Sequence, residues 1–231
     1  MSDRTVELAA NLAEVHARID AACRSAGRDP AEVTLVVVTK TWPADDVRLL
    51  AGLGVRDVGE NRDQEAAPKA VACAGLGLRW HFVGQLQSNK AKSVVRYADV
   101  VHSVDRPHLV RALAAAAESA GRRVGCLVQV RLEPVEGRGG AAPGDALALA
   151  AQIVGAAALD LLGVMAVAPL GEPPERAFAR LAEVAAAVRR EHPDATWVSA
   201  GMSGDLEAAV AAGATHVRVG TAVLGRRPPL G

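Results

Sequence analysis

The sequence has little of what marks a secreted, membrane-bound or nucleic-acid-binding protein. Its 26 acidic and 26 basic residues cancel, so no net charge attracts a polyanion or a membrane surface. No apolar run reaches membrane-spanning length, and the polar start lacks the apolar core of a signal peptide. The cysteines, Cys23, Cys73 and Cys126, have no metal-like spacing and fit free, buried thiols in a reducing compartment. We therefore expect a soluble cytoplasmic protein that binds neither nucleic acid nor membrane.

The motifs of several common enzyme classes are also absent. His81, His102 and His216 stand singly, without the His-x-His pair or nearby carboxylates of a barrel metal site, so we predict no metal. The chain contains no Gly-x-Ser-x-Gly turn for a serine nucleophile. Gly75 and Gly77 precede a strand and lack the third glycine of a dinucleotide-binding turn. These absences argue against a metallohydrolase, a serine hydrolase and a Rossmann dehydrogenase.

What the sequence does contain is a regular alternation of strand and helix patterns. A helix is predicted over residues 6–26, where apolar residues recur at three- and four-residue steps. Short apolar runs then predict eight strands, at 34–38, 55–58, 80–83, 100–102, 124–130, 160–164, 196–198 and 216–219. Stretches with helical spacing lie between them, among them 43–53, 106–120, 145–157, 174–190 and 205–212. Strands separated by helices imply parallel crossover units, and eight of them close a barrel; a doubly wound open sheet is the alternative.

No linker or shift in composition divides the chain. We therefore predict one domain over residues 1–231, an α/β fold consisting of a single (β/α)8 TIM-type barrel with an extra N-terminal helix. The longest irregular stretch is the loop 133–144, with four glycines and two prolines. We expect this loop to lie over the mouth of the barrel.

Lysine is rare, and one lysine has an informative position. Only Lys40, Lys69, Lys90 and Lys92 contribute to the 26 basic residues. Lys40 ends the aliphatic run 34–38, which is typical of a strand buried on both faces, and strand ends in α/β barrels point into the mouth, where the chemistry occurs. Lys40 is then either a surface lysine that reaches water or a partly desolvated amine that forms a Schiff base with an aldehyde.

Two glycine-rich segments near the end of the chain predict a phosphate site. The segment Ser199-Ala-Gly-Met-Ser-Gly-Asp205 follows the seventh strand, and Arg218-Val-Gly-Thr221 covers the end of the eighth. Glycines let a backbone approach an anion, and unpaired amides at a helix start can bind it. Barrel phosphate sites commonly use these two loops. The alternative for the first segment is an ordinary helix cap with Asp205.

The sequence resembles a known family, the pyridoxal phosphate homeostasis proteins, which are single-domain relatives of the alanine racemase barrel. The matching pieces follow the family order along nearly the whole chain. They are Val38-Thr-Lys40, Gly59-Glu-Asn-Arg62, His81-Phe-Val-Gly-Gln-Leu-Gln-Ser-Asn-Lys90, Ser199-Ala-Gly-Met-Ser-Gly-Asp205 and Arg218-Val-Gly-Thr221. The resemblance implies a (β/α)8 barrel that carries pyridoxal 5′-phosphate (PLP) at its mouth.

The resemblance also implies roles for individual residues. Lys40 would form the Schiff base with PLP. The cofactor phosphate would be held by Ser203, Gly220 and Thr221, with help from the amide of Met202. Arg218 would lie beside the pyridine nitrogen, while Asn61 and His81 would line the pocket near the ring; for His81 a purely structural hydrogen bond is the alternative.

The chain departs from the family pattern at positions that carry lysines in many members. Trp42 stands two residues after Lys40, where a second lysine is common, and Arg138 appears to replace a lysine in the loop after the fifth strand. Arginine stays protonated and does not form a stable Schiff base at neutral pH. Lys90 is therefore the main remaining candidate for a second amine. Ala200 stands where methionine is common and should only loosen packing.

The sequence favours a carrier over an enzyme. Racemases of this barrel type use a second acid/base, normally a tyrosine from an additional β domain; the chain ends soon after its eighth strand, and its single tyrosine, Tyr97, is predicted after the third. An arginine at the ring nitrogen would also disfavour the pyridinium form. We expect a monomeric PLP carrier with no catalytic residues, which supplies apo PLP-dependent enzymes. The alternatives are a weak amino-acid racemase or decarboxylase, and an interaction protein with an unused site.

Overall fold

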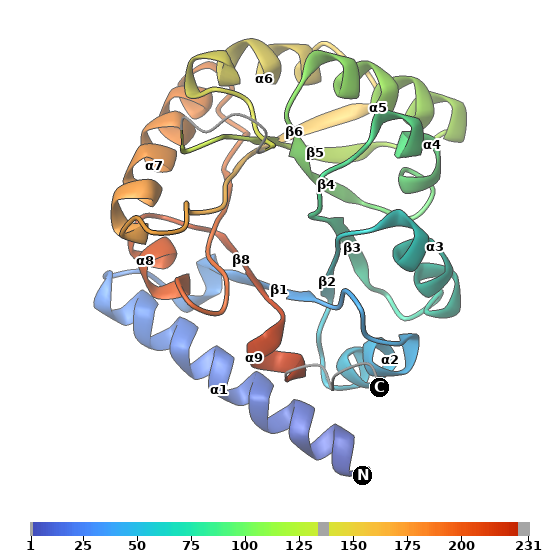
Figure 1. Ribbon diagram of the computed structural model, residues 1–231, viewed down its shortest axis with the longest axis vertical. Helices are drawn as coiled ribbons and strands as arrows, with labels where there is room; N and C mark the ends of the chain where they lie inside the picture. Colours follow the sequence, from blue (N-terminus) through green and yellow to red (C-terminus); the bar gives the residue numbers. More distant parts are fainter. Residues whose placement is uncertain (1, 134–138, 226–231) are drawn as a thin grey trace.

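Eight parallel strands close into a barrel in the computed structural model, which describes residues 2–133 and 139–225. The strands follow each other around the barrel in chain order, and the last pairs with the first (Figure 1). They are β1 (Thr34–Val38), β2 (Asp57–Glu60), β3 (Arg79–Phe82), β4 (Val100–Val104), β5 (Val124–Gln129), β6 (Leu159–Met165), β7 (Trp197–Ser199) and β8 (His216–Val219). The predicted barrel is confirmed, and the open sheet is excluded because β8 pairs with β1 over four residues.

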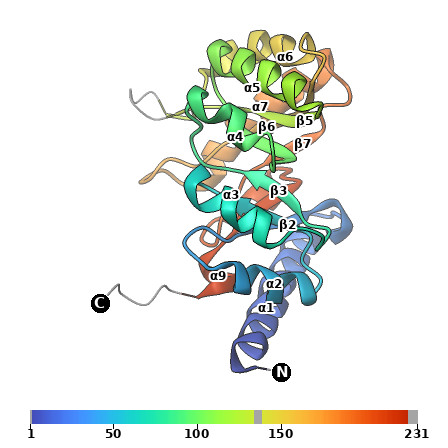
Figure 2. The ribbon, with the colours of Figure 1, turned by 90° about the vertical axis from the view of Figure 1, so that its right-hand side faces the viewer.

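Helices cover the outside of the barrel. They are α1 (Asp3–Ser25), α2 (Ala44–Gly52), α3 (Asp63–Ala72), α4 (Ala91–Val94), α5 (Pro107–Ala120), α6 (Ala146–Val154), α7 (Pro174–Glu191), α8 (Leu206–Ala211) and α9 (Thr221–Leu224). The predicted N-terminal helix is α1, which lies outside the ring of helices against α8 and α9 (Figures 1 and 2). Among the described residues, no helix combines the length and the apolar character needed to cross a bilayer.

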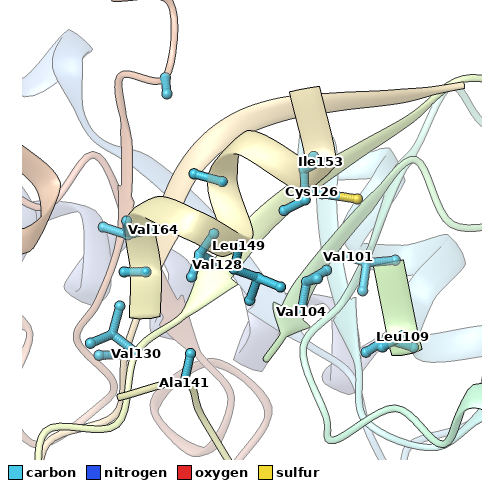
Figure 3. Packing of buried hydrophobic residues seen from close by; sticks show 14 of the residues in the cluster. Val101, Val104, Leu109, Cys126, Val128, Val130, Ala141, Leu149, Ile153 and Val164 are labelled. Atoms are coloured by element: carbon cyan, nitrogen blue, oxygen red, sulfur yellow. The ribbon is translucent and has the colours of Figure 1, made fainter. Parts of the chain in front are cut away.

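The core has an outer layer and an inner one. Outward-facing strand residues pack against the helices in two large clusters; Figure 3 shows Leu149 and Ile153 of α6 beside Val128 and Cys126 of β5. Inside the barrel the apolar part is small. It consists of Val100, Leu127 and Met165, with Leu162 and Trp197 packed against them. The interior also contains several buried polar side chains, among them His81, His102 and Arg218, and such side chains require hydrogen-bond partners.

Most strand boundaries differ from the predicted ones by one or two residues, and the shifts of the second and fourth strands matter for the site. The second strand covers Asp57–Glu60, not 55–58, because Val55 lies in the turn after α2. The fourth strand extends to Val104, two residues beyond its predicted end at His102. These shifts add Glu60 and Ser103 to the barrel wall.

Candidate functional site

A pocket of about 450 Å³ opens at the carboxyl ends of β1, β7 and β8. It brings together most of the residues that the sequence predicts for the cofactor. Its lining includes Val38, Lys40, Thr41, Trp42, Met202, Ser203, Gly204, Arg218, Gly220 and Thr221. This is the end of the barrel at which α/β barrels keep their functional residues.

Among the described residues, Lys40 is the only primary amine in the lining of this pocket, and Thr39 alone separates it from the end of β1. Its neighbours in sequence hold its backbone firmly. Thr39 is fully buried, and Thr41 has a left-handed φ of 69°, which is strained for a β-branched residue. The Thr41 amide donates to the Glu65 carboxylate at 3.0 Å. Lys40 itself is exposed, so the desolvation considered from the sequence is not seen; what this strand end provides is a fixed backbone for a free amine.

A buried ion pair lies directly beneath Lys40, between the sheet and α3. Lys69 of α3 donates to Glu60 Oε1 at 2.5 Å and to the carbonyl oxygen of Thr39 at 2.8 Å. The Thr39 hydroxyl donates to the same carboxylate oxygen at 2.6 Å. Burial raises the pKa of Glu60, while the hydrogen bonds from Lys69 and Thr39 oppose that shift. Sequence reasoning missed this network, although the rarity of lysine had already singled out Lys69.

Arg218 reaches the same pocket from inside the barrel. It is 5% exposed, and it donates from Nη1 to Ser199 Oγ at 2.6 Å and from Nη2 to the Ala166 carbonyl oxygen at 2.9 Å. Within residues 2–133 and 139–225, no carboxylate forms an ion pair with it. Burial lowers its pKa to about 10, which still leaves the guanidinium charged at neutral pH. The site therefore contains a fixed, buried positive charge.

The two predicted phosphate segments lie side by side at the pocket. The Ser203 hydroxyl accepts the amide of Ala222 at 3.4 Å, which ties the loop after β7 to the start of α9. Gly201 has a φ of 88°, and a Cβ there would lie 2.7 Å from the Ala209 side chain, so the loop requires glycine. The Met202 amide donates to Asp205 at 2.6 Å, as in a helix cap, so its use toward a phosphate would require that bond to be exchanged.

Helix α1 supports this part of the site from behind. Arg18 donates to the Ser203 carbonyl oxygen at 2.9 Å, and Asn11 donates to the Val223 carbonyl oxygen at 2.9 Å. Arg4 donates to the Leu224 carbonyl oxygen at 3.0 Å. The extra N-terminal helix thus holds the loop after β7 and the short helix α9 against each other.

One departure from the family pattern lies in this pocket. Trp42 lines the pocket, and its ring lies 4.5 Å from the Arg4 guanidinium, so a cation–π contact stands where a second lysine is common. Arg138 lies outside the described residues, as do residues 134–137 of the predicted mouth loop.

Asn61 and Lys90 lie in a second pocket and not in that of Lys40. This pocket, of about 490 Å³, is formed by the loops after β2 and β3. Gly84 makes their close approach feasible, since a Cβ there would lie 2.2 Å from the Asn61 carbonyl oxygen. The structure thus places Asn61 in the pocket next to that of Lys40, and its position near a cofactor ring stays a prediction.

His81 also departs from its expected place. It is 1% exposed inside the barrel, and both of its ring nitrogens are used, toward His102 at 2.8 Å and Asp57 at 2.9 Å. It does not line the pocket, because β3 directs its side chain into the barrel below the mouth. The structural hydrogen bond considered as the alternative is what the structure shows, although its partners are side chains.

The histidines do not form a metal centre. No group of three His, Cys, Asp or Glu side chains in the described part of the chain has the arrangement of a metal site. His216 stacks on Trp197 with ring centroids 3.8 Å apart, and its Nδ1 lies 2.8 Å from the Thr215 hydroxyl. Cys23, Cys73 and Cys126 are buried and free.

Comparison with known proteins places this site in a family. Residues 10–228 match the alanine racemase N-terminal domain family. The pyridoxal phosphate homeostasis protein of Mycobacterium leprae is 44% identical over 241 residues, covering 96% of this chain and 94% of the relative. The Escherichia coli K12 protein of the same name is 36% identical over 96% of this chain and 97% of its own.

Solved structures show the same architecture. PipY of Synechococcus elongatus, determined with PLP bound, has a TM-score of 0.82 and 37% identity, over 94% of this chain and all of PipY. A protein of unknown function from Bifidobacterium adolescentis has a TM-score of 0.89 and 31% identity, over 96% of this chain and 97% of its own. The chain therefore belongs to the pyridoxal phosphate homeostasis protein family, within the alanine racemase N-terminal domain family.

Proposed function

We propose that this protein binds PLP in the pocket at the mouth of the barrel, through a Schiff base on Lys40, and that it stores and supplies the cofactor in the cytoplasm without catalysing turnover. One observation carries the proposal: Lys40, Ser203, Arg218, Gly220 and Thr221 line the same pocket although they come from distant parts of the sequence. The relatives named for PLP homeostasis and the PLP-bound PipY support the choice of ligand.

The residues present fit the chemistry of this cofactor. PLP supplies an aldehyde that condenses with a primary amine, and Lys40 offers one on a backbone held by its neighbours. Ser203 and Thr221 offer hydroxyl groups for the phosphate. Gly220 lets the end of β8 pass close to β1 at this pocket, since a Cβ there would lie 3.1 Å from the Val38 carbonyl oxygen. We place Arg218 beside the pyridine nitrogen, where its positive charge disfavours protonation of the ring.

The positions of the other acid/base groups favour a carrier over a racemase. Racemisation requires a second group on the opposite face of the substrate to return a proton. Tyr97 does not offer one at the pocket, because its ring packs edge-on against Trp80 of the outer layer at 6.4 Å and burial raises its pKa. A charged Arg218 also weakens PLP as an electron sink. We expect apo PLP-dependent enzymes to be the recipients of the cofactor.

Borohydride reduction tests the attachment. The PLP-loaded protein is reduced, digested and mapped for the pyridoxyl label, with Lys40→Ala as the matched control. We expect about one label per chain, on Lys40, and loss of the visible absorption in Lys40→Ala. A label mainly on Lys90 would move the site to the second pocket and overturn the assignment.

Solvent deuterium exchange separates the carrier from the enzyme. Alanine and other common amino acids are incubated with the holo-protein in deuterated water, and α-deuterium and chirality are then measured. A carrier should show no appreciable racemisation while it reconstitutes apo-enzymes. Rapid exchange with loss of chirality would establish the racemase instead, whereas exchange with retention would mean that Lys40 acts alone on one face.

A further inference from the structure

Five side chains from five strands form a hydrogen-bonded chain through the barrel. Arg218 of β8 contacts Ser199 of β7 at 2.6 Å, and Ser199 Oγ lies 2.9 Å from His102 Nδ1 on β4. His102 Nε2 lies 2.8 Å from His81 Nδ1 on β3, and His81 Nε2 lies 2.9 Å from Asp57 Oδ1 on β2. The three central residues are at most 1% exposed. The chain thus joins the mouth pocket to the opposite end of the barrel.

One direction of donation joins the two ends of the chain. A guanidinium can only donate, so Ser199 Oγ accepts from Arg218, and an ionised carboxylate can only accept, so His81 donates from Nε2 to Asp57. With two neutral rings between these ends, His102 donates from Nε2 to His81 Nδ1, and the Ser199 hydroxyl donates to His102 Nδ1. In this arrangement each imidazole carries its proton on Nε2.

The charges at the two ends agree with this direction. Burial alone would raise the pKa of Asp57, but the hydrogen bond from His81, together with nearby positive charge that includes Arg79 at 3.5 Å, lowers it below its ordinary value. Burial lowers the pKa of His102 well below its ordinary value, which keeps that ring neutral. The chain is a row of aligned dipoles between one cation and one anion, and aligned hydrogen bonds strengthen each other in a dry interior.

Arg218 needs such support. A buried cation without an adjacent carboxylate is costly, and Ser199 is one of only two groups that the described residues place against its guanidinium. Asp57, at the other end, borders a pocket of about 340 Å³ with His16 and Arg56, where the strands begin. Asp205, in the loop after β7, acts on the arginine through space, whereas Asp57 is connected to it only through the hydrogen-bonded chain.

We infer that Asp57, His81 and His102 are positioning residues for Arg218, forming with Ser199 a chain that holds the guanidinium in one orientation toward the cofactor pocket. The expected effect on PLP binding rests on the proposed function. The orientation of the Arg218 guanidinium rests only on the hydrogen bonds within the protein. It also explains why His81, in a family motif, lies away from the pocket.

The test is a double-mutant cycle between the two ends of the chain. Arg218→Gln, His102→Leu and their combination are compared with the native protein for PLP affinity and visible spectrum. His102→Leu should weaken binding about tenfold, as expected for one lost hydrogen bond, and shift the spectrum in the same direction as Arg218→Gln. The double variant should bind no more weakly than Arg218→Gln alone, since both substitutions remove the same interaction. Additive effects would overturn the inference.

Two further variants exclude a merely structural effect. His216→Phe removes another buried histidine of the same interior that is not a member of the chain. It should alter stability but leave affinity and spectrum unchanged. Asp57→Asn keeps the shape of the end residue without its charge, and it should change PLP affinity and spectrum in the same direction as His102→Leu, but less. This variant tests the inference even if His102→Leu does not fold. A spectrum that responds to His216→Phe but not to Asp57→Asn would contradict the positioning role.

A readout without cofactor separates this inference from the proposed function. Nitrogen-15 NMR of the cofactor-free protein should show both imidazoles protonated on Nε2 and slow rotation of the Arg218 guanidinium, which becomes fast in His102→Leu. If the native protein takes up no PLP, the proposed function fails while this result still supports the chain. If guanidinium rotation is the same in the native protein and in His102→Leu, the chain does not orient Arg218 and the inference fails.

Discussion

Two buried polar networks flank the mouth pocket, and they are built differently. The outer network, defined by Thr39, Glu60 and Lys69, lies between the sheet and α3 and sets two opposite charges 2.5 Å apart. The inner network is the five-residue chain from Arg218 to Asp57, in which three neutral groups separate the charges. The outer network contacts the backbone next to Lys40, whereas the inner one contacts the side chain of Arg218.

The difference indicates a division of labour. In the proposed function Lys40 would react with an aldehyde, which requires a stable backbone and a free side chain, and its support acts on the carbonyl of Thr39 and the amide of Thr41. Arg218 would face an aromatic ring, which requires a fixed plane, and its support acts on the guanidinium itself. Breaking the outer network should therefore affect chiefly folding, and breaking the inner one chiefly cofactor binding.

The largest effect should come from breaking the outer pair. Lys69→Met leaves the fully buried Glu60 without its cation and should lower the free energy of unfolding by about 3–5 kcal/mol. The double variant Lys69→Met/Glu60→Leu should recover most of that loss, because no charge then stays buried. Urea unfolding measures both.

The exposed pair Arg123–Asp160 provides the matched control. Arg123→Met should leave the urea midpoint nearly unchanged, since exposed ion pairs contribute little. A loss in Lys69→Met as small as that in Arg123→Met would show that the outer network does not stabilise the fold.

Acid should destabilise the protein through the barrel interior. Burial lowers the pKa of His216 from 6.5 to about 3 and that of His102 well below 6.5. The unfolded chain then binds more protons below pH 6.5, so the free energy of unfolding falls as the pH falls. Between pH 6.5 and 5 His216 alone should cost about 2 kcal/mol, and His102 adds to the loss in the same direction. In His216→Phe the slope of unfolding free energy against pH should be smaller; an unchanged slope would mean that His216 is not held neutral.

Cofactor retention should depend on the two flanks of the pocket unequally. Arg218→Gln should cost about 1.5–3 kcal/mol of PLP binding, because a charge-assisted contact is lost. Ser203→Ala removes one neutral hydroxyl and should cost about 1 kcal/mol. Equilibrium dialysis gives both values, and urea midpoints close to that of the native protein would show that the barrel is intact. Equal losses in the two variants would remove the special role of the arginine.

The sequence predicts the barrel, Lys40 and the two phosphate segments because each has a local signal: an aliphatic strand, a strand-end lysine, and glycines at a turn. The inner chain has no such signal. His102 and Ser199 lie 97 residues apart and meet only because the barrel closes. Glu60 lies just beyond the predicted second strand, 55–58, whereas the structure includes it in β2, where the alternation of the strand directs it outward to Lys69.

The smallest effect concerns the turn at Thr41, which tests what the outer network holds in place. A β-branched residue at a φ of 69° carries roughly 1–2 kcal/mol of backbone strain. Thr41→Gly removes the strain but adds freedom to the unfolded chain, so unfolding free energy should stay equal or rise by up to about 1 kcal/mol. Thr41→Val keeps the β-branch and should gain no stability.

Because the turn fixes the backbone beside Lys40, Thr41→Gly should also bind PLP slightly more weakly while being no less stable. Calorimetry and dialysis on the two variants measure these opposite changes. If the free energy of unfolding of Thr41→Gly instead falls by about 1 kcal/mol, as for glycine at an ordinary position, the turn stores no strain. The outer network would then not hold this turn in a strained conformation.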